Sequence, residues 1–392
     1  MSPELRLIAT CCRWPVDAES SERVRSVAAE VTNWPRVVAL TRSHRVEGLV
    51  WNALRTATVA LPADAGSELA GMAEEVRVEG IRAIGEALRL RAALQKAGIP
   101  FLVIKGLPLA MLSYGTATIK NSIDLDLLVK PADVVRTAAL LVELGYKTMR
   151  PWRPLDADEF ARWSAVAKEA WMVSDRGQVD LHWNLLDQPD LLAALDPWED
   201  TREVDLLPGH SLPTMGDAAH LAYIAAHGAM SGWSRLKWIA DFAAFIAARK
   251  PHERETLCAE ARKIGDSHCL DQGLALANRL LGPGLVPQPA ADREAEQLAV
   301  MAERLIAMRE PGRILEKGRR GARLISKMQW RLRSGARYKW IEARRRFRDQ
   351  EIRFRLRWPL PRRLQWIFFP LRLFGIWSIL GQSLMRAPRS EL

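Results

Sequence analysis

Cysteine is scarce in this sequence: four cysteines occur among 392 residues, which is too few for a disulfide scaffold. Cys11 and Cys12 are adjacent and are therefore unlikely to bridge each other. His268 stands beside Cys269, but no Cys-x-x-Cys pair supports a metal site there. Cys258 and Cys269 are therefore expected to be ordinary buried thiols.

Long apolar runs are also missing. The longest stretch, residues 364–380, contains Pro370 and Arg372 and is shorter than the roughly 20 residues that span a bilayer. Residues 1–6 carry charges where a signal peptide would need an apolar segment. The expected location is therefore the cytoplasm. The hydrophobic content of 48% and charged content of 26% are those of a globular chain.

Positive charge is concentrated at one end of the chain. Residues 311–392 contain 22 Lys/Arg against 5 Asp/Glu, a net of +17, whereas the first 310 residues contain 35 against 41, a net of −6. The overall charge of +11 therefore describes a basic C-terminal region on a slightly acidic body. Arguments about anionic partners apply to this region alone.

Helical periodicity dominates on both sides of a strand-rich middle third. Helices are predicted at six places: residues 36–56, 68–96, 131–144, 217–229, 234–249 and 253–281. Four strands are predicted, the last two as a hairpin: residues 101–104, 123–129, 170–174 and 179–183. The chain then divides into five segments: an N-terminal helical region (1–98), an α/β core (99–212), a helical domain (213–281), a linker and helix (282–310) and a basic Trp/Arg-rich region (311–392).

Two carboxylates lie on one of the predicted strands. Because successive side chains of a strand alternate between its faces, Asp124 and Asp126 point the same way. Neighbouring carboxylates on an apolar strand are tolerable when a divalent cation lies between them, and oxygen ligands suit magnesium. Asp180, with His182 two residues later, lies on the later strand and would complete the site if the two strands are neighbours. For His182, a buried structural role remains as plausible as a catalytic one.

A lysine and a glycine follow the first predicted strand. Gly106 would let backbone N–H groups approach a phosphate at the start of the next helix, and Lys105 would add a positive charge. The Gly-x-x-x-x-Gly-Lys-Ser/Thr pattern of a P-loop is absent from the chain.

These motifs together resemble a known family. The residues that carry the resemblance are Lys105-Gly106, Tyr114, the segments 124–129, 144–146 and 180–183, and the helical stretch from His227 to Asp241. They are similar to the uncharacterised bacterial nucleotidyltransferase family within the DNA polymerase β-like superfamily, over roughly residues 35–310.

The resemblance implies an α+β fold in which a small mixed β-sheet is flanked by N-terminal and C-terminal helical regions. It implies transfer of a nucleoside monophosphate from a nucleoside triphosphate such as ATP, with magnesium, or alternatively manganese, as the metal. Asp124 and Asp126 match the family's metal-binding pair, and Asp180 matches the third carboxylate. Lys120 stands where relatives commonly carry arginine, which keeps the charge but loses the bidentate fork.

Two further questions stay open at the level of sequence. On the helix from Ser234, Lys237 and Asp241 are placed to form a surface i,i+4 ion pair, but Arg235 or Lys237 could equally contact the triphosphate. The basic region could bind an anionic membrane surface, follow nucleic acid, or pack as a helical appendage. We expect the membrane surface rather than nucleic acid, which would make the protein peripheral on the inner face of a membrane.

The acceptor, a small molecule, peptide or protein, is not specified by the sequence. Two other functions remain in view beside nucleotidyl transfer. One is an Asp-x-Asp glycosyltransferase, in which the same pair would bind a metal and a nucleotide diphosphate. The other is a non-catalytic module that binds nucleotide, membrane or nucleic acid.

Overall fold

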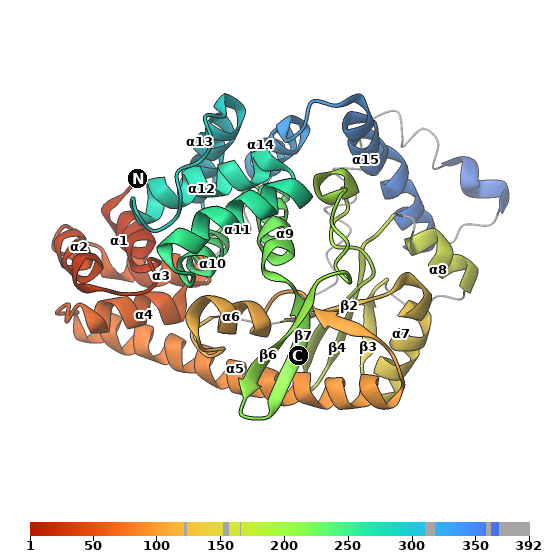
Figure 1. Ribbon diagram of the computed structural model, residues 1–392, viewed down its shortest axis with the longest axis horizontal. Helices are drawn as coiled ribbons and strands as arrows, with labels where there is room; N and C mark the ends of the chain where they lie inside the picture. Colours follow the sequence, from red (N-terminus) through yellow and green to blue (C-terminus); the bar gives the residue numbers. More distant parts are fainter. Residues whose placement is uncertain (121–123, 152–156, 165, 310–317, 358–361, 368–392) are drawn as a thin grey trace. The chain divides into compact units, whose positions relative to one another are not determined.

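The computed structural model describes residues 1–120, 124–151, 157–164, 166–309, 318–357 and 362–367 (Figure 1). The chain forms two compact units. The first combines Met1–Ala97, Leu102–Asp126 and Leu191–Leu332; the second combines Gly98–Phe101, Leu127–Asp190 and Arg333–Leu392. The five segment boundaries expected from the sequence stay predictions.

The N-terminal part of the first unit is helical. Its helices are α1 (Pro3–Cys11), α2 (Ala18–Ala28), α3 (Trp34–His44), α4 (Glu47–Thr56) and α5 (Ala63–Lys96). Side chains of Ser2, Asp17 and Asn33 cap the first three by accepting backbone N–H groups. The single helix predicted over residues 36–56 is wrong, because Arg45 adopts a left-handed conformation (φ 56°) and ends α3.

The same unit contains α6 (Leu107–Tyr114) and a hairpin of β6 (Thr201–Leu207) and β7 (His210–Met215). It continues with six helices: α9 (Asp217–Met230), α10 (Leu236–Ala247), α11 (Pro251–Ile264), α12 (Ser267–Leu281), α13 (Arg293–Ala307) and α14 (Arg319–Arg331). The helix expected over residues 253–281 is interrupted at Gly265, so that α11 and α12 are separate. All four cysteines are buried, as expected for Cys258 and Cys269, and none forms a disulfide within the described residues.

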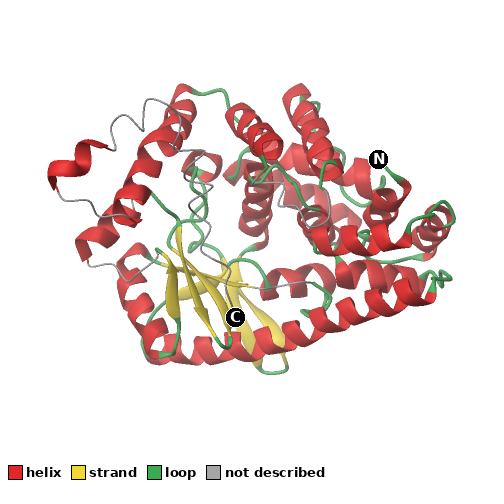
Figure 2. Cartoon of the chain, turned by 180° about the vertical axis from the view of Figure 1, so that it is seen from behind, coloured by secondary structure: helices red, strands yellow, loops and turns green. Residues whose placement is uncertain are grey.

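A mixed five-stranded sheet runs in the order β1-β2-β5-β4-β3, drawn in yellow in Figure 2. Its strands are β1 (Phe101–Val103), β2 (Asp124–Val129), β3 (Lys147–Arg150), β4 (Glu169–Ser174) and β5 (Gly177–His182). The expected hairpin is confirmed: β4 and β5 pair antiparallel, with Ser174 opposite Gly177. The neighbour relation of β2 and β5, on which the third carboxylate depended, is also confirmed.

The helices of the second unit are α7 (Val134–Glu143), α8 (Ala157–Ser164) and α15 (Ala336–Arg357). Tyr338 of α15 is buried, and its carbonyl accepts a hydrogen bond from the Gln188 amide at 3.3 Å. Arg353, Arg355 and Arg357, at every second position of the basic region, all belong to α15. Helices beside a small mixed sheet confirm the α+β class. Within the described residues, no helix is long and apolar enough to cross a membrane.

The segment that leads into β2 is packed tightly in the first unit. A Cβ atom added to Gly48 of α4 would lie 2.2 Å from the Ile119 carbonyl oxygen, and one added to Gly80 of α5 would lie 2.9 Å from that of Ala117. Both obstacles are backbone atoms, so neither can move aside by a change of rotamer. The two glycines therefore allow residues 117–119 to lie directly against two helices.

We predict that Gly48→Ala destabilises the protein by about 1–3 kcal/mol, because the new methyl group forces the backbone of residues 117–119 outward. Gly71→Ala on α5 is the matched control, since nothing lies within 4 Å of its added Cβ atom. It should stabilise by about 0.5–1 kcal/mol through helix propensity. Urea unfolding measures both, and equal stability of the two variants would contradict the tight packing.

Candidate active site

The two carboxylates of β2 stand at its beginning. Asp124 is half-buried, whereas Asp126 is only 3% exposed, and Leu127, Leu128 and Val129 behind them are fully buried. The alternation of a strand places Asp124 and Asp126 on one face, as predicted. A carboxylate as buried as Asp126 needs a cationic partner.

Lys105 supplies that partner. The Ile104 amide donates to the Asp126 carbonyl at 3.1 Å, which sets the end of β1 beside β2. Lys105 Nζ then lies 2.7 Å from Asp126 Oδ1 and 6.0 Å from the centre of the Tyr223 ring. Burial disfavours the charged form of Lys105. The interactions with Asp126, and then with Tyr223 and Asp124, outweigh this effect and hold the pKa of Lys105 well above its usual value. Lys105 is therefore a permanent cation of this site.

Gly106 turns the chain from Lys105 into α6. Its φ of +63° with ψ of −117° is a conformation open essentially to glycine alone. Gly106 is the N-cap of α6, and an added Cβ atom would lie 3.5 Å from the Asp124 carbonyl oxygen. The predicted Lys-Gly turn at a helix N-terminus thus exists and lies beside β2. Its contact with phosphate stays a prediction.

A second lysine–aspartate pair lies on the chain just before β2. Lys120 Nζ is 2.6 Å from Asp241 Oδ2, and the Tyr114 hydroxyl donates to Asp241 Oδ1 at 2.9 Å. All three side chains are buried. Burial, and then the charge of Asp241, raise the pKa of Tyr114 well above its usual value, so the hydroxyl keeps its proton. Of the two interpretations left open for Lys237, the surface pair with Asp241 is wrong, because Asp241 is buried and pairs with Lys120.

Lys237 and Arg235 lie at the start of α10. Burial lowers the pKa of Lys237 to about 8, and the neighbouring charge of Lys120 adds to this effect. Arg235 is the N-cap of α10, and its guanidinium lies 5.5 Å from the Trp238 ring centre. The amide of Leu236 donates to His44 Nδ1 at 3.2 Å. Burial, with Arg309 and Arg235 nearby, lowers the pKa of His44 to about 3, which keeps this nitrogen an acceptor.

N-terminal residues near Lys237 were not predicted from the sequence. The positive charge of Arg45 helps to lower the pKa of Lys237. Burial raises the pKa of Glu47, although the charges of Lys237 and Arg45 partly oppose this rise. Neither Arg45 nor Glu47 belongs to a short motif, and both lie far in sequence from the α/β core of residues 99–212. The only local signal was the end of α3 near Arg45.

The remaining candidate residues lie on the β4–β5 hairpin. Asp180 pairs across the hairpin with Trp171, and His182 with Glu169. His182 is fully buried, and its Nδ1 lies 3.5 Å from Glu169 Oε2. Lys168 forms an ion pair with the same Glu169. Glu169 was not predicted as a residue of the site. Its place there follows from the strand register, which sets it opposite His182.

Within the described part of the chain, Asp126, Asp180 and His182 form a group that could hold a metal ion. One ligand atom from each lies within 4.8 Å of the others. Two carboxylate oxygens and one imidazole nitrogen are suitable donors for a divalent cation. Asp124 lies on the same face of β2 as Asp126 but is not one of these three.

The sequence model of a protein family described as uncharacterised nucleotidyltransferase matches residues 30–282, more than half of the chain. The chain belongs to this family. The match includes every candidate residue named above, from Lys105 to Asp241. The family suggests transfer of a nucleotidyl group, and the Asp–Asp–His group is compatible with it. No curated protein matches the chain.

The basic region lies outside the matched residues, and much of it, including Trp358 and Trp377, lies outside the described residues. Where it is described, Arg345 and Arg346 of α15 both form ion pairs with the buried Glu342. Trp340 and Trp366 are 70% and 66% exposed. Two of the arginines thus have an internal partner, while two tryptophans face solvent.

We predict that Asp241→Ala destabilises the first unit by about 3–5 kcal/mol, because the buried Lys120 ammonium loses its carboxylate. Tyr114→Phe is the control, since it removes one hydrogen bond and leaves the ion pair, at a cost of about 1–2 kcal/mol. Denaturant unfolding followed by circular dichroism measures both. An Asp241→Ala protein as stable as the wild type would show that Lys120 is not held by this carboxylate.

Proposed function

We propose that this protein is a metal-dependent nucleotidyltransferase that moves a nucleoside monophosphate from a nucleoside triphosphate to an acceptor. The observation that carries the proposal is the group formed by Asp126, Asp180 and His182 on neighbouring strands, in a chain of a nucleotidyltransferase family. An acceptor oxygen attacks the α-phosphorus, the bond from this phosphorus to the bridging oxygen breaks, and pyrophosphate leaves. The acceptor's proton passes to Asp180.

The carboxylates Asp126 and Asp180 would hold the metal, with Asp124 beside them and His182 as a nitrogen ligand or support. When bound there, a divalent cation would supply positive charge that offsets the negative charge of the carboxylates and the phosphates. The imidazole favours manganese over magnesium, because nitrogen ligands suit transition metals better. Magnesium remains the expected metal where it is in excess.

The phosphates would be bound by cations of the first unit. Lys105 and Gly106 lie at the N-terminus of α6, and Lys237 and Arg235 at the start of α10. Lys120 is paired with Asp241 and would support the site through this ion pair. Its predicted contact with phosphate would then be less direct.

Lys105 makes metal and nucleotide interdependent. A cation bound by Asp126 would compete with the Lys105 ammonium, which is 2.7 Å from this carboxylate. Lys105 would then need a new anion, and a triphosphate provides one. The metal and the triphosphate should therefore bind better together than either does alone.

The same ion pair favours one alternative, a binding module without catalysis. Lys105 already neutralises Asp126, so the carboxylate is stable without any metal. Failure of all four nucleoside triphosphates to bind with metal would favour this alternative. A glycosyltransferase would instead give a product heavier by a sugar, which mass spectrometry distinguishes from a nucleotide adduct.

The basic region would localise the enzyme. Exposed Trp340 and Trp366 suit the interface of an anionic membrane better than stacking within a folded appendage. A location in the cytoplasm, peripheral on the membrane, and the less favoured binding of nucleic acid both remain proposals.

We predict that calorimetry with ATP, GTP, CTP or UTP and Mn²⁺ detects at least one complex, and that Asp180→Asn weakens it at least tenfold. The loss follows because a neutral amide replaces a metal-binding carboxylate. Asp175→Asn, in the exposed turn of the same hairpin, is the matched control and should bind like the wild type. Equal binding by both variants would remove Asp180 from the metal site.

A second prediction concerns pH. Lys237 has a pKa of about 8, so its ammonium is charged below this pH and neutral above it. Because only the charged form attracts phosphate, affinity for Mn–ATP should fall by about threefold to tenfold as the pH rises from 7 to 9. Calorimetry in two buffers should also show proton uptake on binding near pH 8. Lys237→Met should abolish both effects, and their persistence would exclude Lys237 from the phosphate site.

A further inference from the structure

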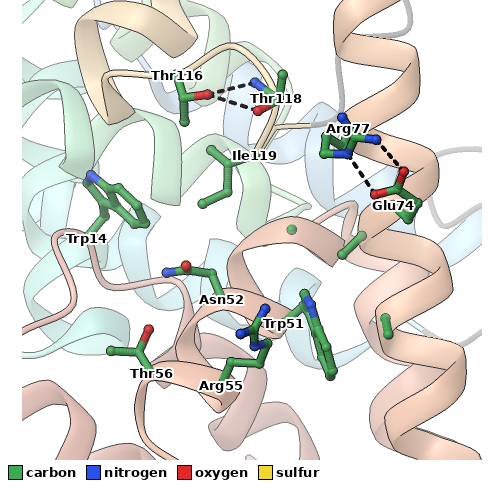
Figure 3. Close-up of a pocket in the computed structure, with 13 residues that line it drawn as sticks. Trp14, Trp51, Asn52, Arg55, Thr56, Glu74, Arg77, Thr116, Thr118 and Ile119 are labelled. Atoms are coloured by element: carbon green, nitrogen blue, oxygen red, sulfur yellow. Dashed lines mark hydrogen bonds and ion pairs between the residues drawn. The ribbon is translucent and has the colours of Figure 1, made fainter.

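The first unit contains a cavity of about 600 Å³ that none of the proposed site residues lines. It lies between α4, α5 and residues 116–119, with Trp14 from the connection between α1 and α2 (Figure 3). Trp14 and Trp51 contribute indole rings, and Asn52, Thr116 and Thr118 contribute polar groups. Such a mixture of aromatic walls and few polar groups is typical of small-molecule sites.

The charges of the cavity leave one cation available. Arg77 and Glu74 neutralise each other through two contacts, with Nε 2.7 Å from one carboxylate oxygen and Nη2 2.5 Å from the other. Arg55 is exposed and has no acidic partner among the described residues, and its guanidinium lies 5.9 Å from the Trp51 ring centre. The lining therefore carries a net charge of +1, from two arginines and one glutamate.

The neutral polar groups also have capacity to spare. The Thr116 and Thr118 hydroxyls bond to each other at 2.9 Å, and the Thr118 amide donates to Thr116 Oγ1 at 3.3 Å, so the Thr118 hydroxyl has the larger spare capacity. The Asn52 amide has no hydrogen-bond partner among the described residues, and Figure 3 shows it between the two tryptophans. A flat ring could therefore contact indole while its polar edge meets amide and hydroxyl groups.

We propose that this cavity binds a small planar aromatic compound that carries an oxyanion. The ring lies against Trp51 or Trp14, and the oxyanion, a carboxylate or a phosphate, accepts hydrogen bonds from Arg55. The planar guanidinium, which already lies over the Trp51 ring, is suited to both anions.

This site is separate from the proposed metal and nucleotide site. None of Lys105, Asp124 and Asp126 lines the cavity, whereas Thr116, Thr118 and Ile119 form one of its walls. The ligand is thus a second molecule and not the triphosphate. The proposal does not depend on nucleotidyl transfer.

The test uses the full-length protein and saturation-transfer NMR with three probes of one shape: benzoate, phenyl phosphate and benzamide. We expect binding of at least one anionic probe with a dissociation constant on the order of 1 mM, as is usual for compounds of this size. Benzamide should bind at least fivefold more weakly. The stronger of the two anions identifies the oxyanion as carboxylate or phosphate.

Two variants locate the probe. Arg55→Gln should reduce binding of the anion at least fivefold and leave benzamide unchanged, and Ala73→Leu, which fills the cavity, should weaken all probes. Arg82→Gln is the matched control, because Arg82 is an exposed arginine of α5 outside the lining. Circular dichroism confirms that each variant is folded.

Three results would overturn the proposal. Neither anion binds the wild-type protein; or Arg55→Gln and Arg82→Gln bind the anion equally well; or saturating Mn–ATP displaces the probe. The last result would assign the cavity to the nucleotide site, whereas loss of Mn–ATP binding by itself would affect only the proposed transferase activity.

Discussion

The carboxylate of Asp241 fixes the geometry of residues 114–120, the segment that precedes β2. One of its oxygens accepts from Tyr114 at the end of α6, and the other pairs with Lys120, six residues later. A single buried charge thus holds both ends of this segment, while Gly48 and Gly80 admit its middle against two helices. The described part of the chain that leads toward β2 is therefore held by a residue of α10.

The local parts of the site could be predicted from the sequence. The shared face of Asp124 and Asp126 follows from strand alternation alone, and the Lys105-Gly106 turn follows from a glycine between a buried strand and a helix. The β4–β5 hairpin was marked by Asp175-Arg176-Gly177 between two apolar alternations. These are properties of short continuous stretches, of which the hairpin, residues 169–182, is the longest, and a sequence displays them directly.

The parts that were not predicted depend on distant residues or on weak local signals. Lys120 and Asp241 are 121 positions apart, and the i,i+4 spacing of Lys237 and Asp241 suggested a different partner. The β6–β7 hairpin was missed because Pro213 in β7 is unusual for a strand, although Pro208-Gly209 marks its turn. The helix ends at Arg45 and Gly265 were also missed, because the apolar periodicity of the sequence continues through both residues.

The segment of residues 114–120 has two sides, and this limits how the two sites can influence each other. Lys120 and Tyr114 face Asp241, whereas Thr116, Thr118 and Ile119 face the cavity. A segment held at both ends and packed on backbone atoms in the middle cannot shift far without losing a buried ion pair, at a cost of about 3–5 kcal/mol. Weak occupation of the cavity therefore leaves this segment in place. Only a ligand that binds Arg55 and both indoles tightly could supply enough differential free energy to move it.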